Sequence, residues 1–277
     1  MNRMLLALLG LAATAAPVFA AERTYSVTDF ERVTVEGPYV VRLVTGRSTT
    51  ARASGPQASI DRVTIETQGQ TLRIRPNRSA WGGNDGAQQG VLEITLTTRV
   101  LRSARVIGAG RLEIDGGEGL RVDLSLEGGG RLSATNIEAD NLFLGLLGSG
   151  RLEVAGRART LRADVQGAGD VVADGLASDD ITLTTTTTGN IAFGTARTAR
   201  VNANGLGEVS VAGNPVCTVT GLGARQIAPP LMRPLGHGTH RHQHGIEPDQ
   251  RPSIFGALLE AEDRLPRDQP VFDDPIE

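Results

Sequence analysis

The sequence contains no lysine, because all 28 of its basic residues are arginine. This excludes any enzyme that depends on a lysine Schiff base or a lysine general base. The single cysteine, Cys217, cannot form a disulfide within the chain, so stability has to come from a packed core. A net charge of −3 argues against nucleic acid as a partner. Aromatic residues are only 3% of the chain and leave few platforms for stacking on sugars.

Long apolar runs are also scarce. The stretch from Leu5 to Ala16 follows the positively charged Arg3 and ends before a small-residue cleavage site at 18–20. This pattern predicts a signal peptide over residues 1–20 and an exported protein that begins near Ala21. The apolar stretch is shorter than the roughly 20 residues of a membrane span. We therefore expect a periplasmic, cell-surface or secreted protein whose mature chain has no transmembrane segment.

What the chain has instead is an internal repeat of 18 to 20 residues. Each unit holds a Gly-x-Gly motif followed by residues that alternate between apolar and polar. The second glycines of the units are Gly110, Gly130, Gly150, Gly169, Gly189 and Gly207. Alternation with a period of two predicts strands with one inward face, and a constant repeat stacks like positions coil upon coil. The sequence therefore predicts an all-β solenoid of about six coils over residues 91–228.

The glycine column has a structural explanation. Each coil has to turn sharply, and we expect a positive φ at the corner, which glycine adopts most easily. The alternative is that bare backbone lets a ligand approach, and the position of the glycines before strands favours the turn.

Residues 21–90 also alternate in the manner of strands, up to a Gly-rich loop at 77–90. The only tryptophan, Trp81, lies in this loop. It could stack on a sugar or a partner surface, or fold back over the end of the solenoid.

The order of these motifs resembles the head GIN domain family, exported bacterial proteins labelled as autotransporter adhesins. The resemblance rests on Phe30–Gly37, Tyr39–Gly46, Leu72–Ile74 and the repeated Gly-x-Gly strands, and it covers about Arg23 to Ile227. The closing motif at 211–215 lacks the aromatic residues common in the family. The resemblance implies an N-terminal β part followed by a right-handed parallel β-helix, and it brings no catalytic residues.

Three arginines occupy one position in successive coils: Arg111, Arg131 and Arg151. One interpretation is a ladder for an anionic polymer such as an acidic polysaccharide. The other is that nearby carboxylates neutralise the column, with Asp170 pairing with Arg151. The carboxylates expected to do so are those of Glu113, Glu127 and Glu153.

Parallel β-helices also include polysaccharide lyases and hydrolases, which need carboxylates at a fixed separation. The acidic residues here are scattered over different columns of the repeat. We therefore expect a non-catalytic, adhesin-like binding protein or cell-envelope scaffold without a cofactor, and keep a carbohydrate-active enzyme as the alternative. Its partner would be a polysaccharide or another envelope protein. A column of acidic residues in one groove would favour the enzyme.

The repeat pattern stops before residues 229–277, which are rich in proline, acid and histidine. We expect a disordered tail with a short amphipathic helix at 253–265 that either covers the open end of the solenoid or contacts another protein. The four histidines are weak candidates for a metal site, because a flexible tract has no preformed geometry. They are His237, His240, His242 and His244.

Overall fold

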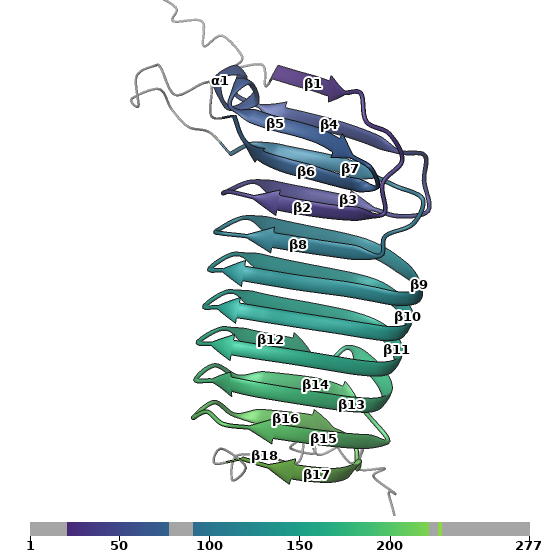
Figure 1. Ribbon diagram of the computed structural model, residues 1–277, viewed down its shortest axis with the longest axis vertical. Coiled ribbons are helices and arrows are strands. Elements are labelled where there is room, and N and C mark those ends of the chain that lie inside the picture. Colours follow the sequence, from purple (N-terminus) through teal and green to yellow (C-terminus); the bar gives the residue numbers. More distant parts are fainter. Residues whose placement is uncertain (1–20, 78–90, 222–226, 229–277) are drawn as a thin grey trace, which may run out of the picture. The chain divides into compact units, whose positions relative to one another are not determined.

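The computed structural model describes residues 21–77, 91–221 and 227–228 (Figure 1). The predictions for residues 1–20, for nearly all of the loop 77–90 with Trp81, and for the tail 229–277 with its histidines therefore lie outside the described residues. All strands of the described chain belong to one 18-stranded sheet, which coils into stacked turns. The predicted all-β solenoid of about 6 turns is confirmed.

Three long strands form the centre of the solenoid. They are β9 (Arg111–Gly128), β10 (Arg131–Gly148) and β11 (Arg151–Gly167), which pair in parallel along almost their full length. Each passes round an edge of the molecule and so contributes to both of its faces, as Figure 1 shows. In later coils the strand is broken at this edge. The column formed by the N-terminal portions of the long strands is then continued by four short strands: β12 (Asp170–Ala173), β14 (Ile191–Thr195), β16 (Val209–Ala212) and β18 (Ile227–Ala228).

We call the side that contains β12 the β12 face and the opposite side the β13 face. On the β13 face the column continues as β13 (Leu176–Thr187), β15 (Thr198–Ala203) and β17 (Val216–Thr220). All of these strands pair in parallel with the strand of the same face in the neighbouring coil. Like residues therefore stack from coil to coil, as the repeat predicted.

The N-terminal strands pair with strands of the repeats and belong to the same sheet. Strand β2 (Arg32–Glu36) lies between β6 (Thr71–Pro76) and β8 (Ser103–Ile107). Strand β3 (Val40–Val44) lies in parallel between β7 (Glu93–Thr97) and β9. The coil made by β2 and β3 is thus inserted between two coils that follow it in sequence (Figure 1). Sequence order alone did not predict this arrangement.

The far side of the β6–β7 coil is covered by antiparallel elements. Strand β4 (Thr50–Gly55) pairs with β7, and β1 (Ala21–Tyr25) pairs with β4. Strand β5 (Val63–Gln68) pairs with β6, and the short helix α1 (Gln57–Asp61) precedes it. A change from parallel to antiparallel pairing ends the regular stack, and β1 and β5 are the edge strands of the described residues at this end.

The core consists of apolar columns that run through the coils. One column is fully buried and pairs residue by residue from β9 to β16: Leu112, Leu132, Leu152, Val171, Ile191 and Val209. The predicted inward alternation is therefore correct. Stability without a disulfide follows from this burial, because each buried side chain of this size contributes about 1.5–3 kcal/mol.

The glycine column lies at the arches between the two faces, but a close backbone approach explains it, not the expected positive φ. A Cβ on Gly130 would stand 2.4 Å from the Gly110 carbonyl oxygen in the neighbouring coil. None of the six predicted glycines has a φ in the left-handed range. That conformation falls two residues earlier, for example at Gly128 with a φ of 111°. The Gly-x-Gly motif therefore meets two separate requirements of the arch.

Candidate functional site

The three arginines of the predicted ladder lie side by side on the β12 face. Arg131 pairs in register with Arg111 on β9 and with Arg151 on β11. Asp170 on β12 follows in the same column. Because neighbouring parallel strands are about 4.8 Å apart, like charges in this column repel one another unless other groups compensate them.

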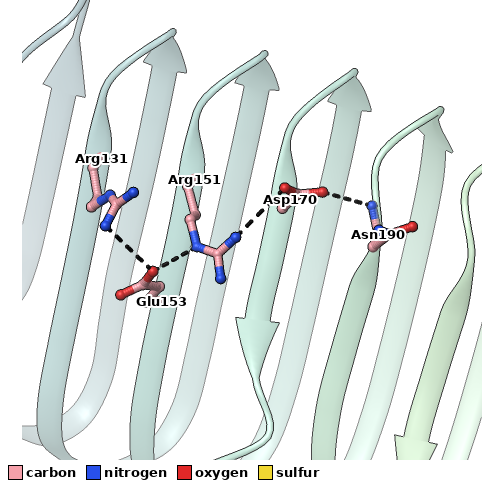
Figure 2. A network of polar contacts seen from close by, with 5 residues as sticks. All are labelled: Arg131, Arg151, Glu153, Asp170 and Asn190. Carbon is pink, nitrogen blue, oxygen red and sulfur yellow. Dashed lines mark hydrogen bonds and ion pairs between the residues drawn. The ribbon is translucent and has the colours of Figure 1, made fainter.

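Carboxylates compensate two of the three arginines (Figure 2). The Nε of Arg151 donates to Glu153 across 2.6 Å, and a second nitrogen of the same guanidinium lies 3.7 Å from Asp170. Arg131 lies 3.9 Å from the same oxygen of Glu153. Asp170 in turn accepts a hydrogen bond of 2.8 Å from the backbone N–H of Asn190. The resulting network joins four coils and leaves little free charge at Arg151.

Two of the carboxylates expected to neutralise the arginine column, Glu113 and Glu127, interact with arginines outside it. Glu113 accepts from Arg42 at 3.1 Å, because Arg42 on β3 occupies the position beside it in register. Glu127 forms its ion pair with Arg105 of β8. Arg111 is exposed and makes no ion pair with any described residue. The ladder interpretation therefore reduces to one unpaired arginine, Arg111, beside the loosely paired Arg131.

A groove of about 800 Å³ runs along the edge where the long strands pass from one face to the other. We call it the edge groove. It crosses five coils, because its lining comes from β9, β10, β11, β13 and the segment after β14. Its floor consists of small residues: Gly119, Ala139, Ala158, Ser178 and Ala196. Sequence reasoning did not find this groove, because small residues at a solenoid corner are equally explained by the turn.

The two walls of the edge groove differ in how their charges are paired. On one wall, Arg159 lies 3.3 Å from Asp140, and Arg197 lies 2.8 Å from Asp179. Each of these ion pairs joins neighbouring coils. The first residue of this wall, Leu120, is 76% exposed although it is apolar.

The opposite wall carries charges in register without such pairing. Glu118 pairs with Glu138, and Glu138 with Arg157, as backbone partners on successive coils. All three side chains are exposed and make no ion pair with another residue in the described part of the chain. This wall therefore offers two carboxylates and one guanidinium to a ligand in the groove.

The described residues include neither a cluster of metal-binding side chains nor a membrane-spanning helix. Among the described residues, no group of three or more His, Cys, Asp and Glu side chains is arranged to hold a metal ion. No helix in the described ranges is long and apolar enough to cross a membrane.

The two side chains with a shifted pKa, Tyr25 and Tyr39, lie far from the edge groove, at the N-terminal end of the solenoid. Burial raises the pKa of the Tyr39 phenol above its usual 10.0, and the neighbouring Tyr25 acts in the same direction. Burial also raises the pKa of Tyr25, an effect that Arg23 opposes and Asp61 reinforces. The Tyr25 hydroxyl is buried and has no hydrogen-bond partner in the part of the chain that the structure describes. Both phenols are therefore structural groups that favour the neutral form.

Solved structures with the same fold support this description. A "putative adhesin" from Bacteroides fragilis NCTC 9343 has 17% identity and a TM-score of 0.67, with 76% of this chain and 95% of that chain covered. A "putative lipid binding protein" from Parabacteroides distasonis ATCC 8503 has 19% identity and a TM-score of 0.60, with 77% and 97% covered. At these identities the likeness shows the fold. A comparison with curated proteins found no match.

The family is shown by the sequence itself. Residues 29–215 match the family model described as "Putative auto-transporter adhesin, head GIN domain". The matched range begins before β2 and ends after β16, so it includes the inserted β2–β3 coil as well as the repeats. The chain belongs to the head GIN domain family.

Proposed function

We propose that the protein is an exported, non-catalytic binding protein of the adhesin type, and that the edge groove holds an extended polymer of the cell envelope. The observation that carries this proposal is the groove across five coils. Four coil spacings of about 4.8 Å give a length on the order of 19 Å, which suits several units of a polymer and not one small molecule. The N-terminal segment 1–20 supports export.

The charges of the groove favour a polar ligand. Glu118, Glu138 and Arg157 are exposed on one wall, and paired charges form the other. A polysaccharide with hydroxyl and charged substituents can bond to both kinds of charge.

A carbohydrate-active enzyme is the second candidate, and one observation favours it. Glu118 and Glu138 are neighbours in register, and the coil spacing of about 4.8 Å is close to the roughly 5–5.5 Å between the carboxyl groups of retaining glycosidases. Both side chains are exposed, however, whereas a glycosidase keeps its general acid in a desolvated environment. We therefore rank binding without cleavage first.

The test is to incubate the purified protein with acidic and neutral bacterial polysaccharides and to score retention and chain cleavage together. Arg157→Glu replaces the exposed guanidinium of this groove wall by a third carboxylate. Arg111→Glu is its matched control, because Arg111 is also exposed and makes no ion pair with a described residue, but lies on the β12 face. We expect retention without cleavage, lost in Arg157→Glu and kept in Arg111→Glu. The reverse pattern would move the site to the arginine column. Cleavage abolished by Glu138→Gln would make the enzyme the primary function.

A further inference from the structure

We propose that Phe143 is the stacking platform of a sugar-binding position on the β13 face, beside the edge groove. This inference rests on the proposed function, since it names the sugar ring as the unit that the surface recognises. Phe143 follows Asp140 of the groove wall by three residues on β10. A polymer that leaves the groove over this wall passes the exposed Asn141 and then reaches Phe143.

Phe143 points outward from the sheet although it is aromatic. Its strand neighbours Leu142 and Leu144 are buried in the core, and because side chains alternate along a strand, Phe143 lies on the outer surface. It is half-buried, whereas Phe30 and Phe193 are fully buried. Core packing therefore does not account for its position.

The local sequence leaves room for the ring to lie along the strand. A Cβ at Gly145 would stand 3.2 Å from Cε1 of Phe143, so the ring occupies the space over this glycine. Leu147, the next outward residue, is 54% exposed. Phe143, Gly145 and Leu147 thus form an apolar row on the outside of β10. An aromatic ring that covers backbone with one face keeps area for stacking a ligand.

Polar groups flank the ring on both neighbouring coils. Asp123 on β9 and Arg162 on β11 are the register partners of Phe143. Arg121 donates to both oxygens of Asp123, at 2.9 and 3.1 Å, and thereby fixes the carboxylate. Arg162 lies 3.7 Å from Asp164.

This composition selects the class of ligand. A carboxylate accepts hydrogen bonds from sugar hydroxyls, and a guanidinium donates to their oxygens. An apolar face with polar groups at its border matches a pyranose ring, which has C–H groups on its face and hydroxyls around its rim. A lipid or a large protein interface would need a wider apolar area than one ring and one leucine. The Tyr25 ring offers no equivalent, because the Arg23 guanidinium lies 5.4 Å from its centre.

The experiment measures the affinity of purified variants for the polysaccharide that retains the wild-type protein best. Phe143→Ala removes the platform, Phe143→Leu keeps apolar bulk without a ring, and Phe143→Trp enlarges the ring. Val216→Ala, which truncates a 75% exposed apolar residue on β17, is the control. We expect a roughly three- to tenfold loss for both Ala and Leu, retained or higher affinity for Trp, and no change for the control. Melting temperatures verify that each variant is folded.

The outcomes separate this inference from the proposed function. Suppose that the wild type is retained and Arg157→Glu is not, but Phe143→Ala and Phe143→Leu bind as the wild type does. Phe143 is then not a stacking platform, whereas the edge groove remains the proposed binding site. If Phe143→Leu binds normally while Phe143→Ala does not, apolar bulk and not stacking is responsible, which also overturns it. If no polysaccharide retains the wild type, both proposals fail and a protein partner becomes the target.

Discussion

Gly150 lies so close to Gly130 of the neighbouring coil that a Cβ on Gly150 would stand 2.6 Å from the Gly130 carbonyl oxygen. A substitution at this position has to push two coils apart or bend the arch between the faces. Overpacking of this kind costs about 1–3 kcal/mol. We therefore expect Gly150→Ala to lower the free energy of unfolding by that amount in urea denaturation. The control is Gly129→Ala, where the nearest atom to the new Cβ is 3.5 Å away. Equal losses in the two variants would contradict the close-approach explanation.

Glu153 connects Arg131 and Arg151, so its removal leaves neighbouring like charges in the column. We expect Glu153→Gln to cost about 0.5–1 kcal/mol at low salt and less at about 1 M NaCl, where exposed charges are screened. The measurement is the free energy of unfolding at both salt concentrations. The control Glu118→Gln removes a carboxylate that makes no ion pair with a described residue and lies beside Glu138, so it should not lower the free energy of unfolding at low salt. A loss for Glu153→Gln that is independent of salt would contradict an electrostatic role.

Thr185 and Thr187 form a matched pair on β13. Both are buried, but the Thr185 hydroxyl has no hydrogen-bond partner among the described residues, whereas the Thr187 hydroxyl accepts a 3.0 Å hydrogen bond from the Gly189 N–H. Valine has nearly the same shape without the polar group. We expect Thr185→Val to stabilise the protein by about 0.5–1.5 kcal/mol and Thr187→Val to destabilise it by about 1 kcal/mol. The free energies of unfolding in urea give both values. The same sign for both variants would be the contrary result.

The buried phenol of Tyr39 predicts a loss of stability at alkaline pH. Its pKa is raised in the folded protein, so above about pH 10 the unfolded chain releases a proton that the folded chain keeps. This contribution is present below pH 10 and is lost as the pH rises through the folded value. For one phenol, the free energy of unfolding can fall by at most about 1.4 kcal/mol per pH unit.

Tyr39→Phe should therefore flatten the decline of the urea midpoint between about pH 9.5 and pH 11. The sequence has no lysine and only two tyrosines, so few other side chains titrate in this window. Tyr25→Phe is the parallel variant, because burial raises that pKa as well. If the urea midpoint falls with pH equally steeply in the wild type and in both variants, the two phenols do not cause the loss of stability at alkaline pH.

The repeats made the solenoid predictable, because stacking depends on a local pattern that recurs. Leu112 and Leu132 are aligned by the repeat length alone, and the structure pairs them. The position of β2 and β3 was not predictable in this way, since their neighbours are distant in sequence and alternation does not identify a partner. The partner of Glu113 was missed for the same reason, because Arg42 reaches it from β3.

The functional surfaces were harder to predict than the fold. Ala139 and Ala158 form the floor of a groove, but alanine at a corner indicates only that space is limited. Phe143 could have been found, because it is the one aromatic residue at an outward position of the long strands. Its significance depends on Gly145, and only the structure shows the ring over this glycine.

The insertion of β2 and β3 between later strands also determines the order in which the chain can fold. From β9 onward each coil adds to the one before it, so pairing is local and needs little loop closure. The β2–β3 coil, in contrast, has one neighbour only after β6 and β7 exist, and its other neighbour only after β8 and β9 exist. During synthesis, β2 and β3 are therefore made before either of their partner coils, and they are fully paired only once β8 and β9 exist. Both edges of this coil are open to other chains until β6 and β7 exist, and one edge stays open until β8 and β9 exist. The hazard of misassembly is therefore concentrated at the N-terminal end of the solenoid.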